Sequence, residues 1–380
     1  MWNIQLFKLN FDHKEVEAVQ DVVSGGWLSM GEKIANFESE FGCFLGDRTM
    51  CSAVSNGTAA LHMALIALNV GVDDEVIIPS LTFIADANVV NLVGAKPVLA
   101  DSDTLDNWNI SLDSIKKAIT KKTKAVIVVH YAGYPCKDIE EISKFCKENG
   151  IGLIEDVAHA PGASIDNKKC GTFGDIGCFS FFSNKNLSIG EGGMVSTLDS
   201  GLHQKLRYIR SHGMTSLTLD RHKGRAITYD VAIPGLNYRM DEMRAAIGSV
   251  QLEKLNDGNK KREELTNRYR KKFLDKSISI PFHHQSKLNT LKSVFHILPI
   301  LLPKNVKRVE VIEYLKKSGI QSSIHYPPFW SFKAYEGQFS KNDYPVTSEI
   351  CDRQLTLPLY PTMKKHEVDS VVNKLLEAIN

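Results

Sequence analysis

Short apolar runs alternate with helix-like stretches between about residue 55 and residue 200, and this alternation restricts the fold more than any other feature. The runs are continuously apolar rather than alternating, which is typical of strands buried on both faces. Strands that alternate with helices form a mostly parallel sheet covered by helices on both sides. The predicted strands are residues 75–79, 96–101, 125–129 and 152–156, and the predicted helices around them are residues 57–69, 84–93, 111–119 and 137–148.

The pattern changes in the second half of the chain. At 380 residues the chain is long for one domain, so we predict two. The first is a large α/β domain over residues 1–250, with the N-terminal segment included, and the second is a small C-terminal α+β domain over residues 251–380. Beyond residue 200 the predicted elements are helices over residues 200–212, 239–275, 306–318 and 364–378, with short strands after about residue 280.

Charge and cysteine content exclude several classes of protein. Lys plus Arg total 46 and Asp plus Glu total 44, and this balance argues against a nucleic-acid binder, which needs a basic surface. The seven cysteines form no C-x-x-C pair, which argues against a disulfide framework or a zinc ribbon and favours a reducing cytoplasm. The chain starts without a signal-peptide pattern, and no apolar run approaches the roughly 20 residues of a membrane helix. We therefore expect a soluble cytoplasmic protein that binds neither nucleic acid nor membrane.

Residues 55–61 (SNGTAAL) combine a small polar turn, a glycine and the start of a predicted helix. Backbone N–H groups at a helix start, together with the helix dipole, attract anions, and the Thr58 hydroxyl adds a donor. The alternative is that Ser55 or Asn56 only caps the helix. The segment is not a Walker loop, and G-x-G-x-x-G does not follow the first strand, so nothing indicates a dinucleotide fold.

A carboxylate ends the predicted strand at residues 152–156. Asp156 stands at its carboxyl end, which is the edge where open α/β sheets bind ligands. A carboxylate placed there can accept a hydrogen bond from a protonated ring nitrogen; the alternatives are a helix cap or a surface ion pair. His159 follows three residues later, and it is either a second ring contact or a half-buried histidine with satisfied hydrogen bonds.

Lys185 lies between an aromatic strand (CFSFF, residues 178–182) and the glycine-rich turn at residues 190–193. A charged lysine is costly to bury among apolar strand residues, so burial lowers its pKa and prepares the amine to attack a carbonyl. The alternative is an ordinary solvated lysine, which is the commoner case. The nearby glycines allow the backbone to approach a ligand closely.

These three segments are more specific together than any one of them alone. An anion cradle, a carboxylate for a pyridine nitrogen and a lysine for an aldehyde are the contacts that pyridoxal phosphate requires. With this set of residues, the sequence resembles the sugar aminotransferases of the DegT/DnrJ/StrS group, which are fold-type I, aspartate-aminotransferase-like enzymes. The likeness runs from about Trp27 to Tyr326. The motifs that carry it are residues 24–31 (SGGWLSMG), 55–61 (SNGTAAL), 79–83 (PSLTF), 155–160 (EDVAHA), 179–181 (FSF), 185–186 (KN), 190–193 (GEGG) and 235–240 (GLNYRM).

The resemblance implies a role for each site residue. Lys185 would hold pyridoxal phosphate as a Schiff base and move the proton between cofactor and substrate, and Asp156 would pair with the ring nitrogen. His159 would lie near the phenolic oxygen, a place that glutamine takes in many relatives. The other implied contacts are Phe83 on the ring face, Gly57, Thr58 and Ser180 at the phosphate, and Asn237, which would reach the phosphate of the neighbouring subunit in a homodimer. For Asn237 the alternative is a turn-forming residue after Gly235.

The implied activity is amino transfer from glutamate or glutamine to a keto sugar, usually nucleotide-linked, with the cofactor cycling through pyridoxamine phosphate. The product would be an amino sugar for polysaccharide or natural-product biosynthesis. Some relatives carry histidine in place of the lysine and are dehydratases, so the retained Lys185 favours transamination. Sugar dehydration, or a non-catalytic regulator on the same fold, are the alternatives. Two departures from the family pattern are Asn184, where relatives often have threonine, and residues 325–327 (HYP), a partial match to the substrate-side motif.

Two further hypotheses concern charged and metal-binding residues. A metal site made of Asp156, His159, His130 and Cys178 matches none of the usual ligand spacings, so we expect no metal. Residues 216–225 are either a specificity loop over the site or an ordinary surface loop. The basic residues that could meet a diphosphate, or that are only surface charges, are Arg210, Lys223, Arg225 and Arg239.

Overall fold

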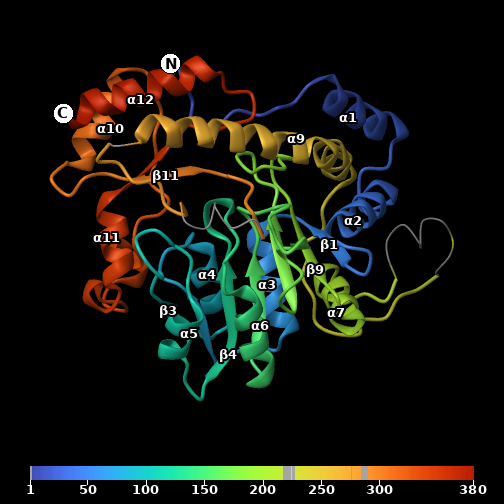
Figure 1. The fold of residues 1–380 in the computed structure, drawn as a ribbon. Coiled ribbons are helices and arrows are strands. Elements are labelled where there is room, and N and C mark those ends of the chain that lie inside the picture. Colours follow the sequence, from blue (N-terminus) through green and yellow to red (C-terminus); the bar gives the residue numbers. More distant parts are fainter. Residues whose placement is uncertain (1, 217–223, 225–226, 275, 284–289) are drawn as a thin grey trace.

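The computed structural model describes residues 2–216, 224, 227–274, 276–283 and 290–380 (Figure 1). Its larger sheet consists of strands β1 (Met50–Val54), β2 (Glu75–Pro79), β3 (Lys96–Ala100), β4 (Thr123–Val129), β5 (Gly152–Asp156), β8 (Ile176–Ser180) and β9 (Gly193–Thr197). Their order is β1-β9-β8-β5-β4-β2-β3. All neighbours are parallel except β9, which runs antiparallel to both β1 and β8. The prediction of a mostly parallel α/β sheet is therefore confirmed.

Helices cover both faces of this sheet. They are α3 (Gly57–Ala67), α4 (Ala85–Leu92), α5 (Leu112–Ala118), α6 (Ile139–Glu148) and α7 (Ser200–Arg210). Val76 and Ile78 of β2 enter one core with α3, α4 and α7, whereas Ile77 between them enters another core with α5 and α6. Successive strand residues point to opposite faces, so a strand covered on both sides must be apolar throughout. This is the continuous apolar pattern of the sequence.

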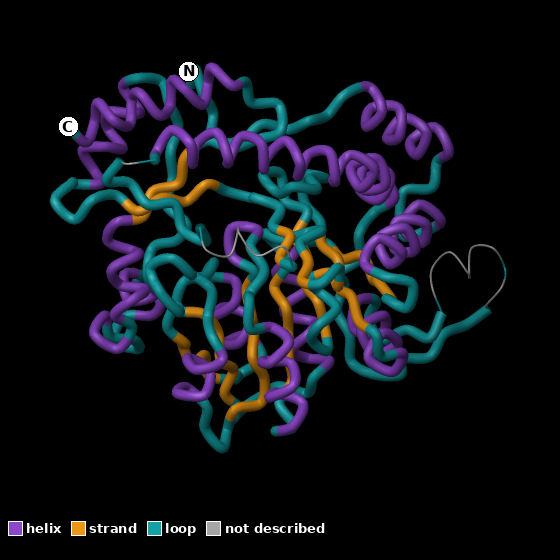
Figure 2. Tube along the Cα trace, viewed as in Figure 1, coloured by secondary structure: helices purple, strands orange, loops and turns teal. Residues whose placement is uncertain are grey.

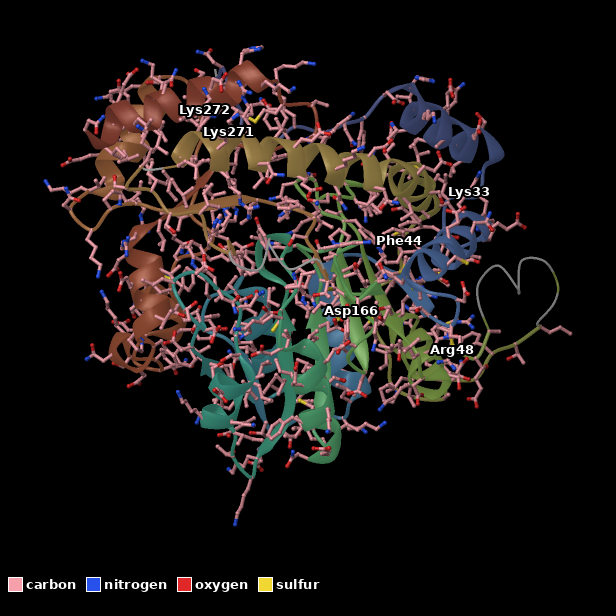
Figure 3. The ribbon with its side chains drawn as sticks, viewed as in Figure 1. Lys33, Phe44, Arg48, Asp166, Lys271 and Lys272 are labelled. Atoms are coloured by element: carbon pink, nitrogen blue, oxygen red, sulfur yellow. The ribbon has the colours of Figure 1, made fainter. Side chains whose placement is uncertain are left out.

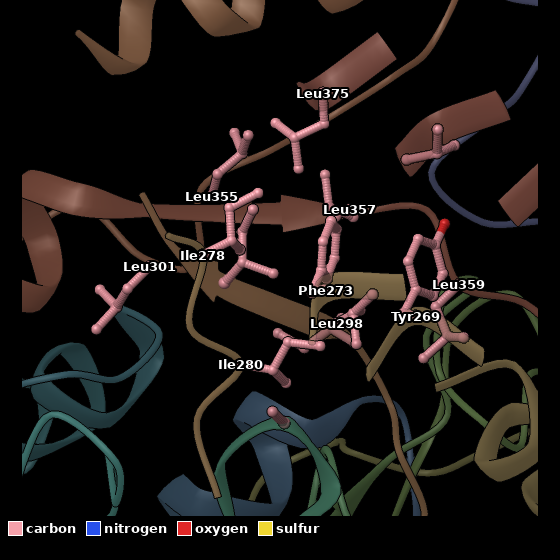
Figure 4. Packing of buried hydrophobic residues seen from close by; sticks show 14 of the residues in the cluster. Tyr269, Phe273, Ile278, Ile280, Leu298, Leu301, Leu355, Leu357, Leu359 and Leu375 are labelled. Carbon is pink, nitrogen blue, oxygen red and sulfur yellow. The ribbon is translucent and has the colours of Figure 1, made fainter. Parts of the chain in front are cut away.

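The C-terminal part of the chain packs around one long helix, α9 (Glu242–Phe273), which lies above the sheet in the view of Figure 2. The other elements of this part are α10 (Arg308–Lys317), β11 (Leu298–Leu301), α11 (Pro345–Arg353), β12 (Gln354–Leu357) and α12 (Lys365–Ile379). Strands β11 and β12 pair antiparallel. Figure 4 shows Phe273 of α9, Leu298 of β11, Leu357 of β12 and Leu375 of α12 in one shared core.

The predicted helices and strands all occur, with ends that differ by a few residues. Among the described residues, three α-helices were not predicted: α1 (His13–Gly25), α2 (Glu32–Leu45) and α11. A signal for α1 exists in the sequence, because Asp12 and Glu15 form a capping box at its start. Helix α2 begins without a side-chain cap. Helix α11 begins at Pro345; proline fits the first helical turn, but on its own it does not predict a helix. No helix in the described ranges is long and apolar enough to cross a membrane.

Helix α9 contacts helices from both the N-terminal and the C-terminal parts of the chain. The buried carboxylate of Glu242, in its first turn, accepts hydrogen bonds from the N–H groups of Gly31, Lys33 and Ile34 at 2.9–3.0 Å. Glu242 thus caps the start of α2, which has no cap of its own. Near the other end of α9, the Arg268 side chain pairs with Asp369 of α12.

The predicted domain boundary at residue 250 falls inside α9, which continues across it without a break. Figure 3 labels Lys271 and Lys272 where the end of α9 lies beside α12, and Lys272 contacts Asp369 at 3.4 Å. The N-terminal segment also reaches the C-terminal part, because the Ile4 N–H donates to the Gly319 carbonyl at 3.1 Å. The division at residue 250 stays a prediction.

We predict that Glu242→Ala lowers the free energy of unfolding by roughly 2–4 kcal/mol, because three N–H groups at the start of α2 lose a charged acceptor. Urea denaturation followed by circular dichroism measures the change. Glu253→Ala is the matched control, since Glu253 lies on the same helix but is exposed. Equal effects of the two substitutions would contradict the capping role of Glu242.

Candidate active site

Six of the seven strands, all except β9, run in the same direction, so the carboxyl ends of β1, β2, β4, β5 and β8 meet at one edge of the sheet. A cavity of about 670 Å³ opens at this edge. Its walls come from the segments that follow these strands, with a further contribution from the C-terminal part. The wall residues that matter here are Gly57, Thr58, Phe83, Asp156, His159, Ser180, Lys185, Tyr238, His325 and Tyr326.

The start of helix α3 forms one end of the cavity. The Asn56 side chain caps the helix by accepting a hydrogen bond from the Ala59 N–H at 2.8 Å. Gly57 and Thr58 occupy the first turn, where N–H groups have no partner within the helix. A methyl group on Gly57 would lie 2.8 Å from the Ser180 Cβ, so only glycine fits against Ser180. Capping and anion binding, the two interpretations of residues 55–61, are therefore compatible.

Asp156 ends β5 and is buried. Its Oδ1 accepts a hydrogen bond from the Ala158 N–H at 2.8 Å. Burial raises the pKa of Asp156, whereas the Ala158 N–H and the charge of Lys185 oppose this rise. A second buried carboxyl, Asp86 of α4, lies within electrostatic reach: burial and the charge of Asp156 raise its pKa well above the usual range, and the Thr82 hydroxyl donates to it. Sequence analysis did not identify Asp86.

Lys185 lies in the loop between β8 and β9, and its backbone N–H donates to the Phe182 carbonyl at 2.8 Å in a tight turn. Burial lowers the pKa of Lys185 to about 8, and the negative charge of Asp156 limits the decrease. A lysine with this pKa carries an appreciable free-amine fraction near neutral pH. The cavity therefore holds a buried amine with a lowered pKa, and its role as a nucleophile stays a prediction.

The hydrogen bonds of His159 determine where its proton lies. Nδ1 accepts from the Ala132 N–H at 3.2 Å, and burial keeps the pKa of His159 well below its usual value, so the neutral ring carries its proton on Nε2. Nε2 then donates to the Tyr326 hydroxyl oxygen 2.8 Å away. Because that oxygen accepts from His159, the Tyr326 hydroxyl can direct its own proton into the cavity.

Tyr326 was not among the predicted site residues. The Phe83 ring, which is half exposed, lies 5.4 Å from the Tyr326 ring, so the two form an aromatic wall. Tyr326 reaches the cavity from a segment 170 residues after β5, a juxtaposition that strand patterns do not reveal. The signal in the sequence was the partial match at residues 325–327.

Seven of the eight predicted site residues line this one cavity: Gly57, Thr58, Phe83, Asp156, His159, Ser180 and Lys185. The eighth, Asn237, does not line it, and its backbone forms a bridge to Ser211. Arg210 is buried and paired with Glu38, so it is a structural residue rather than an exposed diphosphate contact. The Arg239 backbone bridges to Val54. Lys223, Arg225 and most of the 216–225 segment lie outside the described residues.

His130, considered above as a metal ligand, turns away from the cavity. Its Nδ1 accepts from the Cys136 N–H at 3.0 Å, so its Nε2 donates to Glu155 at 2.9 Å. Both side chains are fully buried, and Glu155 also accepts from the N–H groups of residues 171, 173 and 174. In the described part of the chain, no group of three or more His, Cys, Asp or Glu side chains is placed to hold a metal ion.

Comparison with known proteins identifies the family. The sequence profile of the DegT/DnrJ/EryC1/StrS aminotransferase family matches residues 10–376. The chain belongs to this family. It is 35% identical to the spore coat polysaccharide biosynthesis protein SpsC of Bacillus subtilis, over 96% of this chain and 94% of SpsC. It is 34% identical to the GDP-perosamine synthase of Escherichia coli O157:H7, over 98% of each chain.

A solved structure gives the same assignment. The putative sugar aminotransferase Spr1654 of Streptococcus pneumoniae, in its pyridoxamine phosphate form, superimposes with a TM-score of 0.89 at 27% identity, over 97% of each chain. The same protein is also known in its pyridoxal phosphate form, with a TM-score of 0.87. The fold, the enzyme class and the cofactor predicted from the sequence are confirmed: this family member is a pyridoxal-phosphate-dependent aminotransferase, and its cofactor cycles through pyridoxamine phosphate.

The cavity fits this cofactor by its chemistry. The start of α3, with Gly57 pressed against Ser180, leaves room for a phosphate next to unpartnered N–H groups. Asp156 offers a buried carboxylate whose charge a protonated ring nitrogen would balance. Lys185 offers an amine for the aldehyde. The assignment of each residue to its part of the cofactor remains a proposal.

We predict that Gly57→Ala weakens pyridoxal phosphate binding at least tenfold, or about 1.4 kcal/mol, because the added methyl group must displace Ser180. Isothermal titration of the cofactor-free protein measures the dissociation constant. Gly25→Ala is the control, since the space around Gly25 at the end of α1 is open. Unchanged affinity in Gly57→Ala would argue against a phosphate site at this helix start.

We also predict that Asp156→Asn lowers the pKa of Lys185 below 8, because the carboxylate charge raises this pKa. At pH 7.5 the free-amine fraction, and thus the labelling rate of Lys185 by an amine reagent, should increase. Peptide mapping of cofactor-free protein labelled across a pH series gives the midpoint. The exposed Asp113 provides the control variant, Asp113→Asn. A midpoint in Asp156→Asn that stays at 8 or rises would disprove the electrostatic link.

Proposed function

We propose that this aminotransferase moves an amino group from glutamate or glutamine to a keto sugar carried on a nucleotide, and that the resulting amino sugar enters polysaccharide or natural-product biosynthesis. The proposal rests on one observation: Lys185 and Asp156 line the same cavity in a chain of this family. The names of two relatives support the substrate class: one acts in spore coat polysaccharide biosynthesis, and the other is named for a GDP-linked product.

The cofactor, when bound, supplies an aldehyde that exchanges amines and a ring that delocalises negative charge. In this proposal, the N–H groups of Gly57 and Thr58 and the Ser180 hydroxyl bind its phosphate. Phe83 covers one face of its ring, and Asp156 keeps the ring nitrogen protonated. These contacts come from the ends of four strands, β1, β2, β5 and β8, so together they fix the ring relative to Lys185.

Lys185 moves the proton. Its free amine would take a proton from the α-carbon of the donor and give it back during the transfer, while the bound cofactor would supply the delocalisation that makes this carbon acidic. An amine with a pKa of about 8 can both accept and donate a proton, since a general acid or base works best when its pKa is close to the working pH. The Tyr326 hydroxyl, oriented by His159, donates to an oxygen on the cofactor ring or the sugar.

The described residues around the cavity offer little positive charge to the carboxylates of the donor. Among the described residues that line the cavity, Lys185 is the only lysine or arginine, and burial lowers the pKa of His325 to about 4. We therefore propose that the enzyme works as a homodimer in which the second copy contributes to the site. Asn237, which lies outside the cavity of its own chain, is a candidate for that contribution.

Product analysis tests the proposed function. With glutamate and a panel of nucleotide-linked keto sugars, the enzyme should form 2-oxoglutarate and an amino sugar in equal amounts, detected by mass spectrometry. A dehydrated sugar without 2-oxoglutarate would instead show a dehydratase.

Borohydride reduction of the yellow holoenzyme should fix the cofactor on the peptide that contains Lys185. Lys185→Ala should lose at least a thousandfold in turnover, because it removes both the nucleophile and the proton carrier. Lys169→Ala, at a half-buried lysine outside the cavity, should retain activity. Recovery of the label on another lysine would refute the assignment of Lys185.

A further inference from the structure

Lys185 reaches the cavity from the loop between β8 and β9 rather than from a strand or helix. Within the described part of the molecule, its Nζ has neither a hydrogen bond nor an ion pair within 4 Å. The backbone turn to Phe182 holds the residue from one side only. The position of the amine must therefore depend on what holds the next residue, Asn186, which is buried.

Asn186 uses its whole side-chain amide. Nδ2 donates to the Asn259 Oδ1 at 2.7 Å and to the Val294 carbonyl at 2.9 Å. Oδ1 lies 3.0 Å from the His296 Nδ1. All three partners lie more than 70 residues further along the chain, on α9 and in the segment just before β11. Asn186 is thus tied to the C-terminal part rather than to the strand that precedes it.

The orientation of this cluster follows from its two backbone carbonyls. Val294 offers only an acceptor, so the Asn186 atom that faces it is the amide nitrogen. Asn259 in turn donates its own Nδ2 to the Pro161 carbonyl at 3.2 Å, so its oxygen faces Asn186. The oxygen of Asn186 is left for His296, whose Nδ1 must carry a proton and donate. No other assignment satisfies every carbonyl.

The partners of Asn186 are themselves fixed. The buried Arg262 of α9 donates to the His296 carbonyl at 2.9 Å and to the Leu359 carbonyl at 3.0 Å. The His296 ring lies 4.4 Å from that of His159, which lines the cavity. Burial keeps the pKa of His296 well below its usual value, so the ring stays neutral and its Nδ1–H remains the donor. One network therefore connects α9, the residue after Lys185 and the cavity wall.

We propose that Asn186 is a positioning residue for Lys185, and that Asn259 and His296 act through it to hold the amine inside the apolar cavity. This inference deepens the proposed function, because it says what keeps Lys185 reactive. We call the hydrogen bonds of Asn186 to Asn259, Val294 and His296 the clamp. If the clamp is released, the loop that carries Lys185 moves toward solvent and the amine is hydrated. The pKa of Lys185 then rises from about 8 toward the value of an exposed lysine.

The experiment labels cofactor-free protein with an amine reagent over a pH series and follows the Lys185 peptide. Asn186→Ala, Asn259→Ala and His296→Leu should each raise the labelling midpoint by about one pH unit, which lowers the free-amine fraction at pH 7 about tenfold. His296→Asn should restore the parental midpoint, because an asparagine amide nitrogen stands where the histidine Nδ1 does. The rate at which pyridoxal phosphate is captured should follow the same order.

Gln251→Ala is the matched control. Gln251 is a buried amide on the same helix as Asn259, and its side chain donates to Glu15 at 2.6 Å rather than to a residue of the Asn186 network. This variant should lose stability in urea without any shift of the labelling midpoint. If Asn259→Ala and His296→Leu behave in the same way, Asn186 has a structural role only and the inference is wrong.

The measurement also separates this inference from the proposed function. Labelling needs no cofactor, so a shifted midpoint supports the clamp even if a different lysine proves to hold pyridoxal phosphate. Conversely, an unshifted midpoint in an enzyme that transaminates through Lys185 would reject the clamp alone. Should Asn186→Ala fail to fold, His296→Leu removes one hydrogen bond of Asn186 and Asn259→Ala removes another, together with the bond to Pro161, and these two variants decide the question.

Discussion

A shared strand direction determines where the chemistry of this enzyme can take place. Strands β1, β2, β4, β5 and β8 all end at the same edge of the sheet, so the residues that follow them converge although they are far apart in sequence. Gly57 and Phe83 follow β1 and β2, and Asp156 and Ser180 are the last residues of β5 and β8. Their separations are set by the spacing of neighbouring strands, which hydrogen bonding holds nearly constant. The cavity is thus a consequence of the sheet.

Burial gives that edge its electrostatic character. An apolar cavity disfavours every charge, and it therefore raises the pKa of Asp156 and Asp86 and lowers that of Lys185 and the nearby histidines. The opposite charges of Asp156 and Lys185 stabilise each other in part, so burial does not neutralise either group completely. Two carboxyls and one amine in such a space cannot all be charged, and Asp86 carries the strongest penalty. The cavity is therefore prepared for a ligand that brings a cationic nitrogen of its own.

The sequence predicted those parts of the site that follow strands, and it missed the parts that depend on tertiary contacts. Asp156 and Lys185 could be identified because strand patterns place them at a sheet edge, whatever the rest of the chain does. Tyr326 and His296 reach the site from the C-terminal part, and Asp86 comes from a helix whose pattern suggests only packing. Helix α2 escaped prediction for a related reason, because its cap is Glu242, more than 200 residues away. Local sequence patterns do not reveal partners that lie so far away in the chain.

Backbone carbonyls and N–H groups, rather than charges, orient the polar side chains around the cavity. The Ala132 N–H fixes the proton of His159 on Nε2 and so turns Tyr326 into a donor, and the Val294 carbonyl fixes the amide of Asn186. Charged partners would do this less well here, because each would need compensation in an apolar space and would shift the pKa of Lys185. Neutral, backbone-anchored hydrogen bonds hold these side chains in one geometry without adding a further charge beside the Lys185 amine and the Asp156 carboxylate. Hydrogen bonds of the neighbouring residues can therefore hold Lys185 in place although its own amine makes none.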